Sequence, residues 1–225
     1  MKIASYNLHK CRGITGPHAP ERNLAVIRAM APDIIALQEV DFRYGTRPEA
    51  LPRKLIADTT GLVPAIFAGT GEGSLGWHGQ TILMRPELAC DAVVRRLPLP
   101  GLEPRGAISV RVAGLTIVAV HLGLVRSSRR AQLTRIVSQT ARIADGPMIL
   151  VGDFNEWRDD RGMEALAGFR VVIPGRTYPA PIPRLRLDRM ALDRRIHLHR
   201  SGVFDGEVAR GASDHLPIWA EIALP

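Results

Sequence analysis

The feature that most constrains this chain is residues 148–157, MILVGDFNEW. Four apolar residues follow a Gly-Pro pair and lead into a glycine, which is typical of a short buried strand. Asp153 and Asn155 share one side of the chain if the extended geometry continues past Gly152. A carboxylate and a carboxamide so placed suit a hydrated hard cation or a water that must become a nucleophile. A strand that ends in an Asx-rich turn explains the same residues equally well.

Length and composition indicate one domain, residues 1–225, with a largely aliphatic core. Of the 225 residues, 46% are hydrophobic but only 5% are aromatic. No repeat, low-complexity tract or linker divides the chain, and no apolar run reaches the length of a membrane span. Cys11 and Cys90 are too few for a disulfide scaffold and lack metal-site spacing. We therefore expect a soluble protein with no export signal, in the reducing environment of the cytoplasm.

The net charge of +8 comes almost entirely from arginine, because lysine occurs only at Lys2, Lys10 and Lys54. Arginine makes bidentate contacts to phosphate, and a basic surface raises the local concentration of phosphate ligands. Acidic residues are interspersed throughout, so an ordinary solvated surface accounts for the charge equally well.

Strand patterns outnumber helix patterns. The periodicity predicts helices over residues 21–30 and 50–60, a helix capped by Ser127 or Ser128 that runs to about residue 144, and a short helix near residues 163–167. Strands are expected at residues 2–8, 33–39, 63–69, 80–84, 92–97, 107–112, 115–122, 148–153, 169–173, 185–190, 196–199 and 216–223. This mixture favours an α+β sandwich of two sheets with helices outside.

Four apolar strands end in polar residues, and this pattern is the main indication of a site. The pairs are Tyr6-Asn7, Gln38-Glu39, Val120-His121 and Gly152-Asp153. If these ends lie at one edge of the fold, they form a polar rim above apolar walls, where electrostatic interactions are strong.

Two further segments carry residues suited to acid–base and phosphate chemistry. Asp214 and His215 are adjacent, and Asp188 lies upstream of them. A carboxylate beside His215 could fix its tautomer and raise its basicity. Taken singly, Asp214-His215 is more often part of a turn, and Asp188 more often pairs with a surface arginine.

Together, in this order, the motifs resemble the endonuclease/exonuclease/phosphatase superfamily with its deoxyribonuclease-like fold, and in particular its small bacterial members. The resemblance covers residues 2–222 and rests on six short motifs: Tyr6-Asn7, Gln38-Glu39, His121-Leu122, Gly152-Asp153-Phe154-Asn155, Leu187-Asp188 and Ser213-Asp214-His215. It implies a four-layer αββα sandwich of two mixed β-sheets. It also implies hydrolysis of phosphoesters that depends on Mg²⁺ or Mn²⁺, whose preferred ligands are the oxygen atoms found here.

The resemblance also implies a role for each residue. Glu39 would be the main metal ligand, with Asn7 and Asp214 nearby. Asp153 would orient or deprotonate the attacking water, and Asn155 would contact the phosphate. The remaining roles fall to His215, held by Asp188, which would stabilise the pentacovalent state, and to His121, which would serve the leaving oxygen. No Cys or Ser nucleophile belongs to this set, so water would attack phosphorus directly.

Four further residues are candidates for substrate binding: His9, Arg43, Gln80 and Arg129. His9 could line the site beside Asn7, or lie on the surface. Arg43 could clamp a second phosphate, although solvated loop charges are more common. Gln80 stands where many relatives have Asn, which leaves its role open. Arg129 lies at a predicted helix start, a position that favours phosphate binding. Trp157 and Trp219 are expected to be packing residues.

The substrate stays open at this level. Nucleic acid and phospholipid or inositol phosphates compete within the enzyme interpretation, and the oligomeric state is not indicated. The pair Asp188-Arg189 is similar to one in inositol-polyphosphate phosphatases, but the Trp-Cys that precedes it there is Arg186-Leu187 here. A different class of function is a non-catalytic nucleic-acid-binding module that retains the fold.

Overall fold

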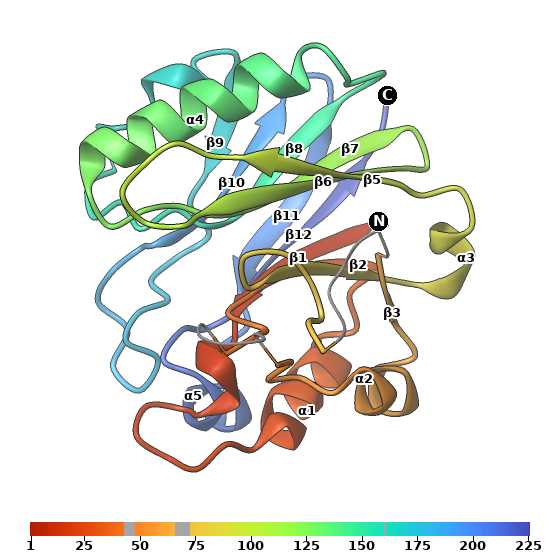
Figure 1. Cartoon of the computed structure of the whole chain (residues 1–225), viewed down its shortest axis with the longest axis vertical. Helices are drawn as coiled ribbons and strands as arrows, with labels where there is room; N and C mark the ends of the chain where they lie inside the picture. Colours follow the sequence, from red (N-terminus) through yellow and green to blue (C-terminus); the bar gives the residue numbers. More distant parts are fainter. Residues whose placement is uncertain (43–47, 66–72, 160) are drawn as a thin grey trace.

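The computed structural model describes residues 1–42, 48–65, 73–159 and 161–225. Two six-stranded sheets stack face to face, and helices cover their outer faces (Figure 1). Each sheet combines parallel and antiparallel pairs, so both are mixed. The expected four-layer αββα sandwich is confirmed.

The first sheet unites the two ends of the chain. Its strand order is β11-β12-β1-β2-β4-β3, in which β1 and β2 are parallel neighbours. The strands are β1 (Lys2–Asn7), β2 (Ile34–Gln38), β3 (Val63–Pro64), β4 (Gln80–Met84), β11 (His197–Val203) and β12 (Ile218–Ala223). All five residues of β2 are buried, as its apolar sequence predicts for a strand covered on both faces.

The second sheet is built from the middle of the chain. Its order is β5-β6-β7-β8-β10-β9, and here β7 and β8 are the parallel neighbours. The strands are β5 (Val93–Pro98), β6 (Gly106–Val112), β7 (Leu115–His121), β8 (Met148–Asp153), β9 (Phe169–Val172) and β10 (Asp188–Asp193). Each sheet therefore has a parallel pair near its centre.

Helices shield the outer face of each sheet. α1 (Pro20–Met30), α2 (Arg53–Thr60) and α5 (Glu207–Ala212) cover the first sheet, whereas α4 (Arg126–Thr140) covers the second (Figure 1). α3 (Pro86–Ala89) and the 3₁₀ turns η1 (His9–Cys11) and η2 (Glu164–Leu166) are short connections. Alternation along the strands divides the core: Ile3 and Ile34 face the space between the sheets, while Tyr6 packs among the residues beneath α1.

Several expectations about individual segments were wrong or incomplete. α4 begins at Arg126 after Val125, with no side-chain cap from Ser127 or Ser128. The helix expected near residues 163–167 is a single 3₁₀ turn, and α5 was not predicted. Of the strand expected over residues 63–69, only Val63–Pro64 is present, and residues 66–69 lie outside the described chain. Among the described residues, no helix has the length and apolarity needed to cross a membrane.

Candidate active site

The two parallel strand pairs end at the same place, and their ends define the site. In the first sheet Asn7 is level with Gln38, and in the second His121 is level with Asp153. The Asn7 amide Nδ2 donates a hydrogen bond of 3.2 Å to Asp153 Oδ2 and thereby joins the two sheets. The structure thus brings together the four strand ends that the sequence marked as polar.

Asp153 is the centre of this cluster and is almost fully buried. Its Oδ1 accepts the backbone N–H of Asn155 at 2.9 Å, and the Asn155 amide in turn donates to the Leu122 carbonyl at 2.9 Å. Two imidazoles approach Asp153 Oδ2: His121 Nε2 at 3.6 Å and His215 Nε2 at 3.7 Å. A single buried carboxylate therefore faces two ring nitrogens across a gap wider than a direct hydrogen bond.

Asp188 and Thr177 hold His215 in place. The Nδ1 atom of His215 donates to Asp188 Oδ2 at 2.8 Å, and the Thr177 hydroxyl donates to the same oxygen at 2.6 Å. The ring of Tyr178 lies 5.0 Å from the imidazole. Because Asp188 accepts the hydrogen bond from Nδ1–H, the opposite nitrogen is directed at Asp153.

The environment sets different protonation states for the three groups. Burial raises the pKa of Asp153 to about 6, although nearby His215 opposes this change. Burial lowers the pKa of His215, but the carboxylates of Asp188 and Asp153 outweigh it and raise the value to about 10. Burial, helped by the charge of Arg105, holds the pKa of His121 well below its usual value. At neutral pH the site combines a carboxylate, an imidazolium and a neutral imidazole.

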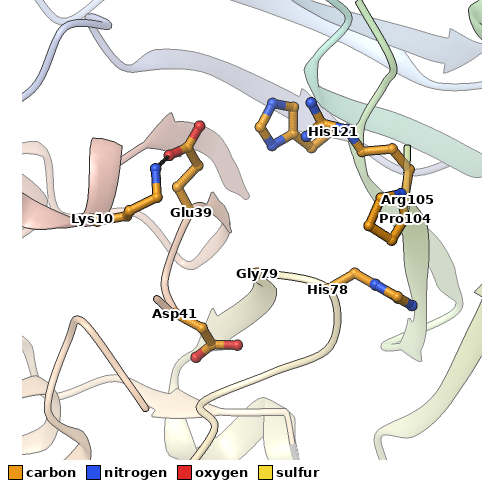
Figure 2. A pocket seen from close by; sticks show the side chains of 8 residues that line it. All are labelled: Lys10, Glu39, Asp41, His78, Gly79, Pro104, Arg105 and His121. Carbon is orange, nitrogen blue, oxygen red and sulfur yellow. Dashed lines mark hydrogen bonds and ion pairs between the residues drawn. The ribbon is translucent and has the colours of Figure 1, made fainter. Parts of the chain in front are cut away.

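A pocket of about 70 Å³ opens beside this cluster. Figure 2 shows Lys10 and Glu39 on one wall, joined by an ion pair, with His121 and Arg105 opposite. Burial raises the pKa of Glu39, but His121 and the Lys10 ammonium lower it to about 2, so the carboxylate is ionised. His121 is neutral at neutral pH and so carries no charge to act on Glu39. The Lys10 ammonium is therefore the positive charge that keeps the Glu39 carboxylate ionised. The residues that line the pocket are Lys10, Glu39, Asp41, His78, Gly79, Pro104, Arg105 and His121.

The backbone around the site adopts conformations that side chains other than glycine usually avoid. In the described chain eight non-glycine residues have positive φ, and six belong to the site or flank it. Such conformations persist only where the surroundings enforce them, and they cluster at functional sites. The six are His9, Lys10, Cys11, Glu39, His78 and Asn155, with φ between 46° and 58°.

Asp214 lies beside the turn that follows β1. Ser213 Oγ donates to the Asn7 carbonyl at 2.6 Å, which fixes the segment before His215 against the end of β1. His9 donates its backbone N–H to Asn7 Oδ1 at 3.1 Å, and its Nδ1 lies 3.8 Å from Asp214 Oδ2. His9 and Asp214 thus flank Asn7.

The oxygen donors of Glu39, Asn7 and Asp214 fit a small hard cation such as Mg²⁺. No group of three or more His, Cys, Asp or Glu within the described ranges is arranged to hold a metal ion. Mg²⁺ does not need such a group, because it keeps several waters and binds through one or two carboxylates. The ionised Glu39 can serve in this way once Lys10 releases it.

The remaining predicted residues have other surroundings. Gln80 is fully buried, and its amide donates to the Gly106 carbonyl. Arg129 is 4% exposed and donates to Glu156 Oε2 at 2.7 Å, so its guanidinium is committed within the fold. Arg43 lies outside the described residues. Neither Gln80 nor Arg129 is among the pocket-lining side chains.

A network of charged groups that no sequence pattern indicated fixes the segment after Asn155. The side chain of Glu156 is fully buried and accepts hydrogen bonds from Arg126 at 3.2 and 3.0 Å and from Arg129 at 2.7 Å. Arg189, also fully buried, donates to the Glu156 carbonyl at 2.6 Å and to the Arg158 carbonyl at 3.0 Å. Lys10, Arg105 and Thr177 were likewise missed, because only the fold brings them to the site.

The chain resembles known proteins over its whole length. It is 29% identical over 253 residues to the uncharacterized protein YbhP of Escherichia coli, covering all of this chain and 96% of YbhP. Among solved structures, a functionally unknown conserved protein from Enterococcus faecalis has a TM-score of 0.76 at 21% identity, with full coverage of both chains. A mannosyl-6-phosphatase from Bacteroides thetaiotaomicron has a TM-score of 0.74 at 18% identity, again with full coverage.

A TDP2 structure from D. rerio, complexed with a single-strand DNA product, has a TM-score of 0.73 at 20% identity and covers 99% of this chain and 98% of TDP2. At these identities the solved structures show a shared fold. The sequence model of the endonuclease/exonuclease/phosphatase family matches residues 4–215, nearly the entire chain. This protein therefore belongs to the endonuclease/exonuclease/phosphatase family.

Proposed function

We propose that this protein is a phosphoester hydrolase that depends on Mg²⁺ or Mn²⁺ and activates a water for direct attack on phosphorus. Members of its family are phosphoester hydrolases. The observation that carries the proposal is the position of Asp153, a buried carboxylate that faces His121 and His215 at 3.6 and 3.7 Å. The three groups lie close enough together to contact one reacting group bound beside them.

Each residue of the cluster has a task that its surroundings support. With a pKa of about 6, Asp153 is largely ionised at neutral pH and can accept a proton from water. His215, held by Asp188, is positively charged and stabilises the charge that develops on the phosphoryl oxygens. Asn155 orients the phosphate. Neutral His121 faces the leaving oxygen and polarises it.

Glu39, Asn7 and Asp214 are the residues that would hold the metal. When bound, a divalent cation neutralises charge at phosphorus and at the leaving oxygen. His9 flanks Asn7 and Asp214, where it would contact substrate at the edge of the site.

A non-catalytic module that binds nucleic acid is the alternative. The net charge of +8 supports phosphate binding by either kind of protein. Binding alone, however, does not require a buried carboxylate between two imidazoles, which is costly to maintain. The cluster therefore favours the enzyme.

The test is a hydrolysis screen with Mg²⁺, and with EDTA in parallel, over supercoiled DNA, single-stranded DNA, RNA, inositol phosphates and phospholipids. Asp153→Asn and His215→Ala should each lower the single-turnover rate by about 10²–10³-fold, because each removes a group that acts in the transition state. Asp145→Asn and His197→Ala make the same chemical changes at exposed positions and should leave the rate intact. Wild-type rates in both site variants, or full turnover in EDTA, would exclude this mechanism.

A further inference from the structure

Exposed apolar side chains gather around the mouth of the site instead of being scattered. In the described chain six large apolar side chains are more than half exposed, and five of them lie on connecting segments at this end of the fold. We call these five the apolar rim: Leu102 (99% exposed), Leu124 (66%), Val125 (55%), Trp157 (70%) and Ile182 (64%). The sequence predicted that Trp157 would pack inside, and that prediction was wrong.

The segments of the apolar rim come from separate parts of the chain but share one edge of the molecule. They are the β5–β6 connection, the approach to α4, the segment after β8 and the connection between β9 and β10. In Figure 1 the β5–β6 connection, the start of α4 and the light-blue β9–β10 connection all lie on the left. The four segments that carry the apolar rim thus lie at the same end of the fold as the ends of β7 and β8, where His121 and Asp153 are located.

Polar contacts fix the first two segments to each other and to the pocket. Glu103 Oε1 accepts the backbone N–H of Leu124 at 2.8 Å. Its other carboxylate oxygen accepts from Arg105 at 2.8 Å, and Arg105 lines the pocket. Glu103 therefore ties the segment that carries Leu102 to the segment that carries Leu124.

Hydrogen bonds from two arginines connect the other two segments to the rest of the apolar rim. Arg126, next to Val125, donates to the buried carboxylate of Glu156, which precedes Trp157. Arg186 donates to Asp159 at 2.6 Å and so connects the segment of Trp157 with the β9–β10 connection. The same connection carries Thr177 and Tyr178, which contact Asp188 and His215. The apolar rim is thus built on the elements that position the site.

An apolar surface held in this way needs an occupant, since soluble proteins rarely gather such groups. A tryptophan and aliphatic side chains interspersed with arginines are typical of proteins that lie on the interface of an anionic membrane. The side chains of Arg126, Arg130 and Arg186 are 43%, 60% and 47% exposed, and each also pairs with a carboxylate. The positive charge that attracts an anionic surface is therefore the net +8 of the chain. A nucleic-acid groove would instead be lined by donors to phosphate and by aromatic platforms, whereas only Trp157 of the five rim residues is aromatic.

We infer that the apolar rim docks on an anionic phospholipid surface and brings a lipid phosphodiester to Asp153. This inference rests on the proposed function and assigns its substrate class. Water adds to phosphorus, one ester P–O bond breaks, and the departing oxygen takes up a proton to leave as an alcohol beside a phosphomonoester. The apolar side chains enter the membrane interface, while the net positive charge of the chain attracts the anionic headgroups.

The test is flotation of the full-length protein with phosphatidylcholine vesicles, with and without phosphatidylglycerol. The wild type should bind the anionic vesicles, with a blue shift in tryptophan emission, and salt should weaken binding. Trp157→Ala and Leu124→Ser should each reduce partitioning by about tenfold, since each removes apolar area from the interface. Val93→Ser is the matched control, because Val93 is a partly exposed residue on β5 outside the apolar rim.

Two further measurements separate this inference from the proposed function. Glu39→Gln should still bind vesicles, and the rim variants should still hydrolyse a small water-soluble phosphodiester. Binding of vesicles without hydrolysis of any substrate would refute the proposed hydrolase function but would still support the docking surface. Hydrolysis without vesicle binding, or equal losses in Val93→Ser, would overturn the docking surface. If the rim variants lose oligonucleotide binding but keep vesicle binding, the surface binds nucleic acid and the inference of a lipid-docking surface is refuted.

Discussion

Replacing Glu156 by Gln should destabilise the fold strongly, because it leaves a buried charge without its partner. The substitution keeps the shape of the side chain and removes its negative charge. Arg126 is 43% exposed and retains water, but Arg129 is 4% exposed and loses the anion that neutralises it. Removing one partner of a buried ion pair typically costs about 3–5 kcal/mol.

The pKa of Glu156 gives a similar magnitude. Burial raises this pKa, but the hydrogen bonds from Arg126 and Arg129 outweigh it and lower the value from 4.5 to about 2. Each pKa unit corresponds to about 1.4 kcal/mol, so the charged form contributes roughly 3 kcal/mol to stability. In a chain of this size about 1 kcal/mol shifts the melting temperature by about 2–4 °C. We expect Glu156→Gln to melt roughly 6–12 °C below the wild type.

The pH dependence provides a second check by calorimetry. Because the folded state lowers the pKa of Glu156, the stabilisation is complete above the unfolded value of about 4.3 and is lost as pH falls toward 2. The two melting temperatures should therefore differ most at neutral pH and converge in acid. Asp145→Asn, at an exposed carboxylate, is the control. A difference below about 2 °C, or one that does not shrink in acid, would refute this account of the network.

Three further predictions concern the site and its supporting strand. In single-turnover assays the double variant Asp188→Asn/His215→Ala should be little slower than His215→Ala, because Asp188 acts through the imidazole. Lys10→Met should tighten Mg²⁺ binding measured by titration calorimetry, because it removes the cation paired with Glu39. Gly152→Ala should lose the cooperative melting transition seen by circular dichroism, because its Cβ would overlap the neighbouring strand's backbone.

Each of these predictions has an outcome that contradicts it. Additive rate losses would show that Asp188 acts independently of His215. Lys54→Met is the control for Lys10→Met. If Lys10→Met does not bind Mg²⁺ more tightly than this control does, Lys10 does not compete with the metal for the Glu39 carboxylate. A stable Gly152→Ala variant that melts like Gly168→Ala, where the added methyl meets open space, would show that β7 and β8 separate easily.

The polar strand ends were predictable from sequence, because polar residues that directly follow a buried apolar strand have few possible positions other than the edge of the sheet. Asn7 and Asp153 meet as expected, and the β1–β2 and β7–β8 pairs are parallel, which places like ends together. The pairing of His215 with Asp188 was also anticipated, since the resemblance to the family implied that Asp188 holds His215. What they do in the molecule remains a proposal.

Other parts of the site were not predictable, because they depend on tertiary contacts. Arg129 looked like a phosphate ligand at a helix start, yet Glu156 neutralises it from another segment. Lys10 gave no signal, because only the left-handed turn at η1 directs it toward Glu39. Trp157 was expected to be a packing residue, but its neighbour Glu156 takes the buried position. Outside a regular helix or strand, local patterns do not indicate which of two adjacent residues turns inward.

The first sheet is made from both ends of the chain, and this has a consequence for biosynthesis. β1 needs β12 as its neighbour, and the hydrogen bonds that close the site join residues 146 and 206 positions apart in sequence. A growing chain emerges from the ribosome N-terminus first, so β1 must wait unpaired on that side until β12 (Ile218–Ala223) has been made. The site that Asn7 and Asp153 share would then form only after β12 has paired, and truncated chains that lack β12 would not assemble it.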